Sequence, residues 1–419
     1  MKVMHLISGG DSGGAKTHVH SLLQNLARTI DVTMVCFMEG PFSQEARELG
    51  IPTVVLPGHN LLRVRNTLKK MIVEGGYQIL HCHGARGNLM GALLGKATGL
   101  PVVSTVHSDY RLDYLGRPFS RITYGTINTI ALRRLDYRIG VSDAMTDLLI
   151  SRGFDPDKLF TIYNGIDFTP RTPALDRAAY WKSVGLEADK TSVVVGIAAR
   201  LNPVKDIATL VRGFALAHQE CPNLRLLIAG DGEQMGMLKN LAAQLGVEKQ
   251  VCFAGWITDT DSFYNAIDIN TLTSLSETFP YSLTEGARAG LPTVASRVGG
   301  VPYLIEHGIH GFLFEAGDPD GLARHLVTLA KDPALRQHMG QRLYQRAKED
   351  YSLESTLQRQ LTIYETILRR QSRKTGPRDG ALVCGAYGRG NAGDDAILEA
   401  IVTELRQIDP DLPIWVLSR

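Results

Sequence analysis

The chain has 419 residues, of which 44% are hydrophobic and 21% are charged, and its formal net charge is +2. This length exceeds what one ordinary hydrophobic core organises, so it predicts two domains with additional chain. The near-neutral balance excludes a composition typical of nucleic-acid binding.

Short β-branched runs alternate with amphipathic stretches along the chain, which predicts βαβ units around parallel sheets. In the first half we expect strands at 3–8, 31–37, 53–56, 79–81, 102–106 and 137–141. In the second half we expect them at 193–197, 225–229, 251–253, 268–272 and 293–295. Residues 164–173 (NGIDFTPRTP) have the composition of an interdomain linker.

The expected fold class is therefore α/β, with two Rossmann-like doubly wound domains at residues 1–168 and 169–370. The second domain is expected to end in a long helix at 353–370, and a basic linker at 371–378 follows. Residues 379–419 predict one βαβ fragment. A single βαβ unit cannot cover both faces of a parallel sheet, so the fragment is either docked on the main body or part of a truncated third domain.

The cysteines and the N-terminal segment favour a cytoplasmic location. Five cysteines are widely spaced, which suits a reducing compartment and offers neither a zinc cluster nor a disulfide framework. The first ten residues contain too short an apolar run for a signal peptide. No stretch of 18 apolar residues is present, so we expect no membrane-spanning segment.

The segment 276–290, SETFPYSLTEGARAG, carries two carboxylates eight residues apart. Glu277 is expected in a loop and Glu285 on the first turns of a helix, with Pro280 in its first turn. Free backbone amides of residues 281–283 would then form an anion site at the carboxyl end of a strand, where open α/β sheets bind ligands. Glu285 could accept two hydrogen bonds from a ribose diol. The alternative is a capped helix with solvated acids.

Upstream, GIAARLNPVK at 196–205 places Arg200 and Lys205 in the loop after the first strand of the second domain. Both cations could reach one diphosphate, and together they would neutralise a doubly charged leaving group. The alternative is a pair of ordinary surface cations. A further glycine-rich turn, AGDGE at 229–233, is nonspecific by itself.

In their order and spacing these motifs resemble the retaining glycosyltransferases of family 4, which have the two-domain GT-B fold. The resemblance covers about residues 1–370. It also includes GGDSGGA at 9–15, VVSTVHSDY at 102–110, GVSDAM at 140–145 and YNGID at 163–167. It implies a nucleoside-diphosphate sugar donor and retention of the anomeric configuration, without a metal or another cofactor.

The resemblance assigns the nucleotide to the second domain. Arg200 and Lys205 would hold the donor diphosphate, and Glu285 would hold the ribose. The backbone of Gly13 and Gly14 would close over the phosphate from the opposite domain.

The resemblance also assigns residues to the donor sugar. Glu277 and His107 would lie against it, with His107 near the primary hydroxyl and the reacting carbon. Phe279, Tyr281 and Ser282 are the other predicted donor-binding residues. The leaving phosphate would help to deprotonate the acceptor on the same face, so no carboxylate nucleophile is required.

Two residues depart from the family pattern. Pro280 stands where glycine is common, which removes one backbone amide that could bind a sugar hydroxyl. Lys16 stands where an acidic residue is frequent, which leaves the acceptor contacts open.

Two patterns have the residue types of metal sites, but we expect neither to bind a metal. Asp259 and Asp261 have the spacing of a metal-diphosphate motif, yet they precede an amphipathic run where aspartates favour a helix N-terminus. His81 and His83 lack further ligands at zinc spacing and are expected at a strand end that lines the cleft. His18 and His20 face opposite sides of one helix, so they cannot both serve one site.

Residues 111–138 contain six arginines and two aspartates among aromatic and aliphatic side chains. Such a surface could lie against anionic lipid and meet a lipid-linked saccharide acceptor, which would make the protein peripheral to the inner face of the membrane. The alternative is an ordinary helix whose arginines extend to solvent.

The tail resembles a different family. GAYGRGNAGDDAIL at 385–398, followed by a helix and IWVLSR, is similar to the opening of bacterial polysaccharide pyruvyltransferases. The alternative is a generic glycine-rich loop before a capped helix. The resemblance implies a parent polypeptide that couples sugar transfer to pyruvylation.

These features predict a retaining hexosyltransferase that moves a sugar from a nucleoside diphosphate, with UDP as the default, to a cell-wall or envelope polysaccharide precursor. One alternative is a GT-B nucleotide-sugar epimerase, which needs acid and base groups in the sugar pocket. Another is a noncatalytic sugar-nucleotide-binding protein. The combination of two cations with two carboxylates argues against the latter, because a sensor needs fewer precisely placed charges.

Overall fold

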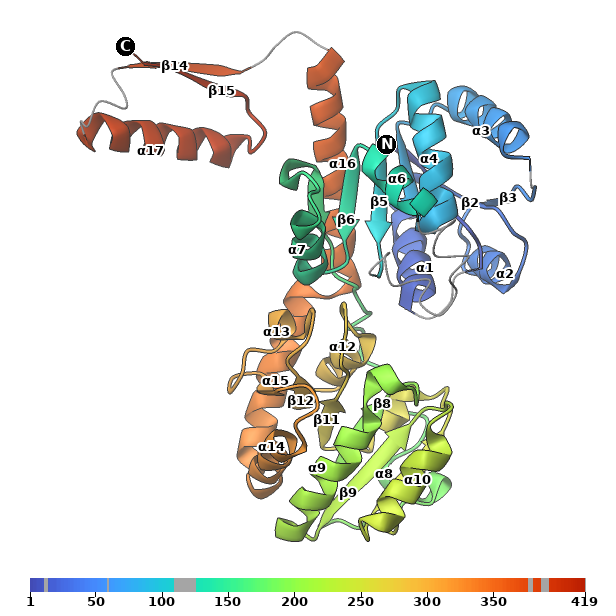
Figure 1. Cartoon of the computed structure of the whole chain (residues 1–419), viewed down its shortest axis with the longest axis vertical. Coiled ribbons are helices and arrows are strands. Elements are labelled where there is room, and N and C mark those ends of the chain that lie inside the picture. The colour runs from blue at the N-terminus through green and yellow to red at the C-terminus, as the bar shows by residue number, and fades with distance from the viewer. Residues whose placement is uncertain (11–13, 59, 109–125, 376–379, 386–391, 419) are drawn as a thin grey trace.

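The computed structural model describes residues 1–10, 14–58, 60–108, 126–375, 380–385 and 392–418. Within these residues the chain forms two α/β lobes, one above the other along the long axis, and a small third unit at the C-terminal end (Figure 1). The expected class, two Rossmann-like parallel-sheet domains, is confirmed. The domain division near residue 168 stays a prediction.

The first lobe is built on a seven-stranded parallel sheet in the order β3-β2-β1-β4-β5-β6-β7. Its strands are β1 (Lys2–Ile7), β2 (Asp31–Cys36), β3 (Thr53–Val55), β4 (Ile79–His83), β5 (Val102–Val106), β6 (Tyr137–Gly140) and β7 (Leu159–Thr161). Its helices are α1 (Gly14–Leu26), α2 (Pro41–Glu48), α3 (Leu61–Gly75), α4 (Gly84–Thr98), α6 (Thr126–Arg134) and α7 (Asp143–Ser151). Every residue of β4 and β5 is buried, as expected for central parallel strands covered on both faces.

The second lobe has a six-stranded parallel sheet in the order β10-β9-β8-β11-β12-β13. Its strands are β8 (Val193–Ala198), β9 (Leu224–Ala229), β10 (Val251–Gly255), β11 (Ile269–Leu272), β12 (Thr293–Ser296) and β13 (Gly311–Phe314). Its helices are α8 (Arg177–Val184), α9 (Ile207–Glu220), α10 (Met235–Gln244), α11 (Thr260–Asn265), α12 (Tyr281–Arg288), α13 (Val301–Leu304), α14 (Pro319–Lys331) and α15 (Pro333–Asp350). Both sheets share the strand order of the doubly wound fold.

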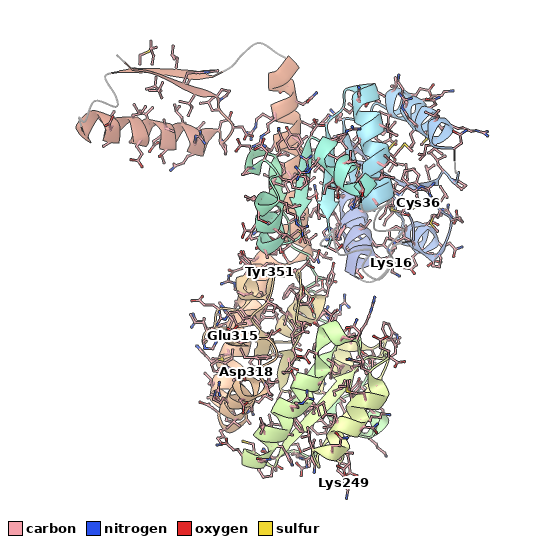
Figure 2. The ribbon with its side chains drawn as sticks, viewed as in Figure 1. Lys16, Cys36, Lys249, Glu315, Asp318 and Tyr351 are labelled. Carbon is pink, nitrogen blue, oxygen red and sulfur yellow. The ribbon has the colours of Figure 1, made fainter. Side chains whose placement is uncertain are left out.

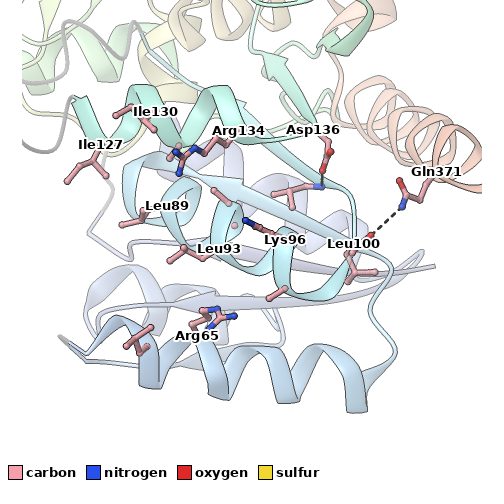
Figure 3. A pocket seen from close by; sticks show the side chains of 18 residues that line it. Arg65, Leu89, Leu93, Lys96, Leu100, Ile127, Ile130, Arg134, Asp136 and Gln371 are labelled. Atoms are coloured by element: carbon pink, nitrogen blue, oxygen red, sulfur yellow. Dashed lines mark hydrogen bonds between the residues drawn. The ribbon is translucent and has the colours of Figure 1, made fainter. Parts of the chain in front are cut away.

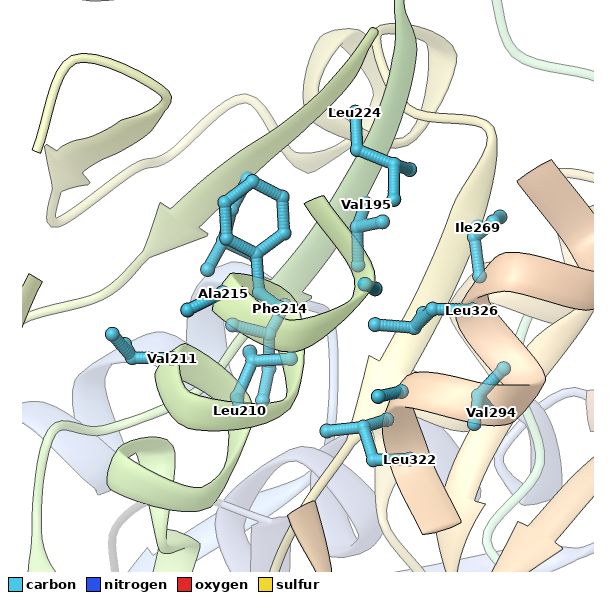
Figure 4. Packing of buried hydrophobic residues seen from close by; sticks show 14 of the residues in the cluster. Val195, Leu210, Val211, Phe214, Ala215, Leu224, Ile269, Val294, Leu322 and Leu326 are labelled. Carbon is cyan, nitrogen blue, oxygen red and sulfur yellow. The ribbon is translucent and has the colours of Figure 1, made fainter. Parts of the chain in front are cut away.

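Apolar side chains from helices and strands interlock to form the core of the second lobe. Phe214 and Leu210 on α9 and Leu322 and Leu326 on α14 are fully buried against the sheet (Figure 4). Val195 on β8 belongs to the same cluster. This packing fixes where β8 ends, and therefore where the loop carrying Arg200 and Lys205 begins.

The long helix predicted at 353–370 is α16 (Leu353–Thr375), so it continues into the predicted linker 371–378, and it leaves the second lobe to pack on the first. Ile363, Tyr364 and Ile367 belong to the buried cluster that contains residues of β1, β2 and α1. Helices α1 and α16 are in direct contact. The chain therefore returns to its first lobe after completing the second.

The C-terminal unit consists of β14 (Ala381–Gly385), α17 (Ala392–Ile408) and β15 (Ile414–Ser418), with the two strands paired in parallel. Asp411 forms ion pairs with Arg369 at 3.0 Å and with Arg370 at 2.7 Å, both on α16. Leu382, Ile397 and Leu417 are exposed. The unit is thus attached to α16 by charged contacts and keeps apolar surface open, as a single βαβ unit must.

The predicted strands are confirmed to within two residues, but two strands were not predicted. They are β7, three residues long, and β13, four residues long. Both pair at the end of a sheet. Among the helices that the structure describes, none has the length and apolar character needed to cross a bilayer.

Candidate functional site

Each sheet has one place where the strand order reverses, and open α/β sheets bind ligands beyond the carboxyl ends of the strands at this place. In the first lobe it lies between β1 and β4, and in the second between β8 and β11. The arrowheads of β5 and β6 point from the first lobe toward the second (Figure 1). The loops after β8 and β11 carry the cations and carboxylates that the sequence singled out.

The loop after β8 is held in place by the turn after β9. Ala199 N–H donates to Ala229 at 3.0 Å, and Leu201 N–H donates to Asp231 at 2.9 Å. Gly230 has φ +133, and a Cβ built there would lie 1.8 Å from the Ala199 carbonyl oxygen. The AGDGE turn, which looked nonspecific in the sequence, therefore supports the backbone on both sides of Arg200. The Arg200 side chain is exposed.

Lys205 and Glu277 form an ion pair, so the two loops meet across neighbouring strands. Ser274 Oγ donates to the same Glu277 oxygen at 2.6 Å. Thr273 Oγ1 donates to the Lys205 carbonyl at 2.9 Å, which ties the loop backbones together. The Glu277 side chain is 10% exposed and that of Lys205 is 25% exposed. A partly buried charge pair with a further hydroxyl donor is a preorganised polar site rather than two solvated side chains.

The loop that carries Glu277 rests on a pair of glycines that the sequence analysis missed. Gly299 has φ +48, in the left-handed region, and a Cβ there would lie 1.6 Å from the Glu277 carbonyl oxygen. A Cβ on Gly300 would lie 2.0 Å from the Thr278 carbonyl oxygen. The signal in the sequence is the dipeptide after β12, which follows a strand end as glycine-rich ligand loops do.

Glu285 lies on α12 and is positioned by a tyrosine. Tyr264 on α11 is fully buried, and its hydroxyl donates to Glu285 Oε2 at 3.0 Å. Burial raises the pKa of Glu285, while the hydrogen bond from Tyr264 opposes that rise. The Tyr281 hydroxyl is buried and has no hydrogen-bond partner among the described residues. Glu285 thus has a fixed orientation beside an unused donor, which suits a polyol ligand.

The start of α12 differs in detail from the prediction. Pro280 flanks the helix in an extended conformation, and the helix begins at Tyr281. Leu283 N–H donates to the Pro280 carbonyl at 3.2 Å, so it is not one of the free amides predicted for 281–283. Tyr281 and Ser282 remain the candidate amide donors. The Phe279 side chain is buried against Tyr163, so only its backbone could contact a ligand.

In the first lobe, His107 directly follows β5 and is half-buried. Burial, with a smaller contribution from His18, lowers the pKa of His107 to about 3. At neutral pH the ring is therefore uncharged and can only exchange hydrogen bonds with a ligand. Gly14 is the first residue of α1, and Gly13 lies outside the described residues. Lys16 pairs with Glu45 at 2.8 Å and lies at the edge of the first lobe nearest the second (Figure 2).

The two metal-like patterns have structural partners. The Asp259 side chain caps α11 by accepting from Ser262 N–H at 3.0 Å, as predicted. Asp261 forms an ion pair with Arg288 at 2.5 Å. His81 and His83 are buried within β4, so the expectation that they line a cleft is wrong.

The two histidines of α1 separate as predicted. The His18 ring meets His107 edge to face with centroids 5.2 Å apart, while His20 lies 4.4 Å from Phe42. Only His18 is therefore beside the candidate site.

Two arginines of the basic segment 111–138 have structural contacts within the described residues. Residues 111–125 lie outside the described residues. Arg138 is buried and donates to the Leu132 carbonyl at 2.9 Å, so it is a structural residue. Arg133 donates to the Arg152 carbonyl at 2.8 Å and lies over the Phe154 ring.

Two doubly wound lobes, with polar loops beyond a strand reversal in each, define a protein of the GT-B architecture. Residues 12–169 match the family model Glycosyltransferase Family 4, and residues 182–346 match Glycosyl transferases group 1. The chain is a glycosyltransferase of the GT-B fold.

Two similar proteins are named as glycosyltransferases, and one similar structure holds UDP. The Escherichia coli UDP-Gal:alpha-D-GlcNAc-diphosphoundecaprenol alpha-1,3-galactosyltransferase is 25% identical over 319 residues, which is 73% of this chain and 81% of that protein. The D-inositol 3-phosphate glycosyltransferase of Corynebacterium efficiens is 27% identical over 81% of this chain and 87% of its own length. The structure of HepE from Anabaena in complex with UDP has a TM-score of 0.76 and 23% identity, and the match covers 87% of this chain and all of HepE.

Proposed function

We propose that this glycosyltransferase moves a hexose, with retention, from UDP to a saccharide precursor of an envelope polysaccharide, without a metal. The E. coli relative is named for a UDP-galactose donor and a diphosphoundecaprenol-linked sugar acceptor. The HepE structures contain UDP or UDP-glucose. A cytoplasmic location stays a prediction from the sequence.

The chemical requirement is that the departing UDP gains negative charge as the bond between the sugar and phosphate breaks. Arg200 and Lys205 would stabilise that charge, Glu285 would accept the ribose hydroxyls, and Gly13 and Gly14 would close over the phosphate from the first lobe. Preorganised cations need no reorganisation at the moment of reaction, so they can replace a divalent ion.

Contacts to the donor sugar would come from both lobes. Glu277 would accept hydrogen bonds from sugar hydroxyls, and uncharged His107 would exchange one with the primary hydroxyl near the reacting carbon. Tyr281 and Ser282 would offer backbone amides. The leaving phosphate would take the acceptor proton on the same face of the sugar, which retains the anomeric configuration.

The observation that carries this proposal is the contact between Lys205 and Glu277. It joins one group suited to phosphate and one suited to sugar hydroxyls at the strand reversal of the second lobe. Lys205 would then contact donor phosphate on one side while it keeps its ion pair with Glu277 on the other.

The test is turnover of UDP-sugars by the Lys205→Ala variant. We expect kcat/KM to fall by about 10²–10³, as for removal of one preorganised group at a developing negative charge. Lys331→Ala is the matched control, because Lys331 forms an exposed pair with Glu220 at 3.1 Å on α14. Unchanged turnover in Lys205→Ala would overturn the proposed role. Inversion, read from the anomeric coupling constant of the product, would overturn retention.

Two alternative functions make different predictions in the same assay. An epimerase would convert a UDP-sugar to its epimer without an acceptor. A noncatalytic binding protein would show a thermal shift with UDP-sugars but no turnover with any acceptor.

A groove on the first lobe supports the proposed lipid-linked acceptor. It has a volume of about 1270 Å³ and lies among α3, α4 and α6 (Figure 3). Apolar side chains line it, including Leu93, Ile127 and Ile130. Arg65 and Arg134 lie among them (Figure 3). Apolar contact combined with positive charge suits a peripheral contact with an anionic membrane.

Liposome co-sedimentation tests this contact. We expect Arg65→Glu combined with Arg134→Glu to weaken binding to vesicles that contain anionic lipid. Lys249→Glu is the control, because Lys249 lies at the far end of the second lobe (Figure 2). Binding that is independent of anionic lipid content would contradict the contact.

The C-terminal unit is proposed as a pyruvyltransferase-like piece on the basis of its resemblance at 385–398. Its single helix and two strands form no second ligand-binding lobe within the described residues. We therefore assign it no catalysis of its own. Removal of residues 376–419 is expected to leave sugar transfer unchanged in the turnover assay.

A further inference from the structure

A continuous row of hydrogen-bonded side chains runs through the interior of the first lobe and ends at His107. We call it the histidine row, and its members in order are Thr105, His81, Tyr364, His5, His83 and His107. The successive donor–acceptor distances are 2.7, 2.6, 3.1, 3.0 and 3.3 Å. The row joins β1, β4 and β5 to α16, and 359 positions separate His5 from Tyr364.

The members of the row before His107 are buried and uncharged. Thr105, His81, His5, His83 and Tyr364 are each exposed by 1% or less. Burial lowers the pKa of His5, His81 and His83 well below the usual value, and their mutual repulsion adds to this effect.

The end of the row is uncharged as well. The ring of His18, from α1, faces His107, and burial lowers the pKa of His18 to about 4. At neutral pH the histidines of the row and His18 are therefore uncharged, and each ring carries a single N–H proton.

A neutral imidazole has one donating and one accepting nitrogen. In a row of such rings each hydrogen bond fixes the direction of the next, so the hydrogen bonds run either toward His107 or away from it. The direction decides which nitrogen of His107 carries the proton. Tyr364 transmits the direction because its hydroxyl can accept from one ring and donate to the other.

The threonine end distinguishes the two directions. If the row runs toward His107, Thr105 O–H donates to His81 Nε2 and every buried donor has an acceptor. If it runs the other way, His81 donates to Thr105 and the hydroxyl proton of Thr105 needs another acceptor. Among the described residues Thr105 Oγ1 has no second partner. A buried hydroxyl without an acceptor is costly, so the direction toward His107 is favoured.

We propose that the histidine row holds His107 in a single tautomer, with its proton on Nδ1. His83 Nδ1–H then donates to His107 Nε2, and His107 Nδ1–H is available as a donor. His5, His81, His83 and Tyr364 are positioning residues, because they act on the donor sugar only through His107. Their effect on turnover rests on the proposed function, whereas the tautomer does not.

A metal site is the alternative explanation for this cluster. One nitrogen each from His5, His81 and His83 lies within 4.8 Å of the others. However, each of these rings already has neighbours for its two nitrogens. The hydrogen bonds along the row already use both nitrogens of each ring.

The first test is the ¹⁵N NMR spectrum of the imidazole groups in the full chain. His107 is identified by the signals lost in His107→Gln. We expect a protonated-type shift for Nδ1 and an unprotonated-type shift for Nε2 at neutral pH. A proton on Nε2 in the parent protein overturns the proposal without the need for any other variant.

The second test breaks the row at two places. In Tyr364→Phe and in Thr105→Val we expect the His107 nitrogen signals to move toward averaged values. We also expect kcat to fall about tenfold, with KM for the donor within about twofold, because the donor contacts remain. Thr105→Ser restores the hydroxyl and should restore the parent spectrum, which a purely steric role would not explain.

The matched control is Tyr351→Phe, which removes a buried hydroxyl that donates to the Tyr303 carbonyl at 3.1 Å outside the row. It should leave the His107 signals unmoved. Unmoved His107 signals in both Tyr364→Phe and Thr105→Val would refute the row. If those signals move but Lys205→Ala retains full turnover, the proposed function fails and the row stands.

Discussion

Replacement of Gly299 by alanine tests whether the backbone beneath Glu277 must stay in place. A Cβ at residue 299 would lie 1.6 Å from the Glu277 carbonyl oxygen, while real contacts of this kind stay above 3.0 Å. The Glu277 backbone would therefore have to shift by about 1.4 Å to relieve the clash. That backbone positions the carboxylate paired with Lys205.

Two separate costs follow from this substitution. Alanine in the left-handed conformation costs about 1–2 kcal/mol, which lowers the free energy of unfolding by a similar amount. A misplacement of about 1 Å in a group that positions substrate can lower the rate about 10²-fold. We expect Gly299→Ala to show both the loss of stability and a fall of about 10² in kcat.

Gly317→Ala separates the two costs. Gly317 has φ +80 and no heavy atom within 4 Å of a Cβ built there. This variant should lose about 1–2 kcal/mol in urea denaturation, which is less than the loss in Gly299→Ala because it has no clash, and it should keep the parent kcat with a UDP-sugar donor. If Gly299→Ala turns over as fast as Gly317→Ala, the glycine does not position Glu277 for transfer, and the reasoning is wrong.

Further predictions concern Glu285, Asp206 and metal dependence. Burial raises the pKa of Glu285. Because the ribose contact needs the carboxylate, UDP affinity measured by calorimetry should fall as the pH decreases toward that raised pKa. Glu285→Gln should bind UDP more weakly and without this pH dependence. The folded state holds this proton more readily than the unfolded state, so the contribution of Glu285 to the free energy of unfolding should increase as the pH falls through the raised pKa. Asp206 has φ 44, and its side chain caps α9 by accepting from Thr209 N–H. Asp206→Ala should therefore lower the free energy of unfolding in urea by about 2 kcal/mol. Asp206→Asn should lower it by less than half as much. A chelator should leave turnover unchanged, and a loss of activity restored by a divalent ion would contradict metal-free transfer.

Most of the fold could be predicted from the sequence because its signals are local. The strand expected at 102–106 is β5 with the same bounds, and the helix expected from residue 353 is α16. The position of α16 could not be predicted. Its amphipathic pattern shows that one face is buried, but not that this face packs on β1 and α1 of the other lobe. That choice depends on tertiary contacts between distant parts of the chain.

The sequence pointed to the charged residues of the candidate site but not to the residues that hold them in place. The residue types of Lys205, Glu277 and Glu285 point to phosphate and hydroxyl ligands without a structure. The residues that hold them in place act through close backbone packing and through one hydrogen bond. Gly230 and Gly299 allow backbones to approach too closely for a Cβ, and Tyr264 orients Glu285 from another helix. Such contacts leave only a glycine or an ordinary aromatic residue in the sequence.

The connections between the lobes determine how the histidine row would respond if the lobes moved relative to each other. Ile166 N–H donates to the Tyr351 carbonyl at 3.1 Å, and Leu353 N–H donates to the Ile166 carbonyl at 2.9 Å, so the two chain crossings are paired at one place. Beyond this place α16 packs on the first lobe and places Tyr364 in the row. A closing motion about the paired crossings would carry α16 with the first lobe. Closure would then change the distance from His107 to Glu277 and leave the hydrogen bonds that orient the imidazole intact.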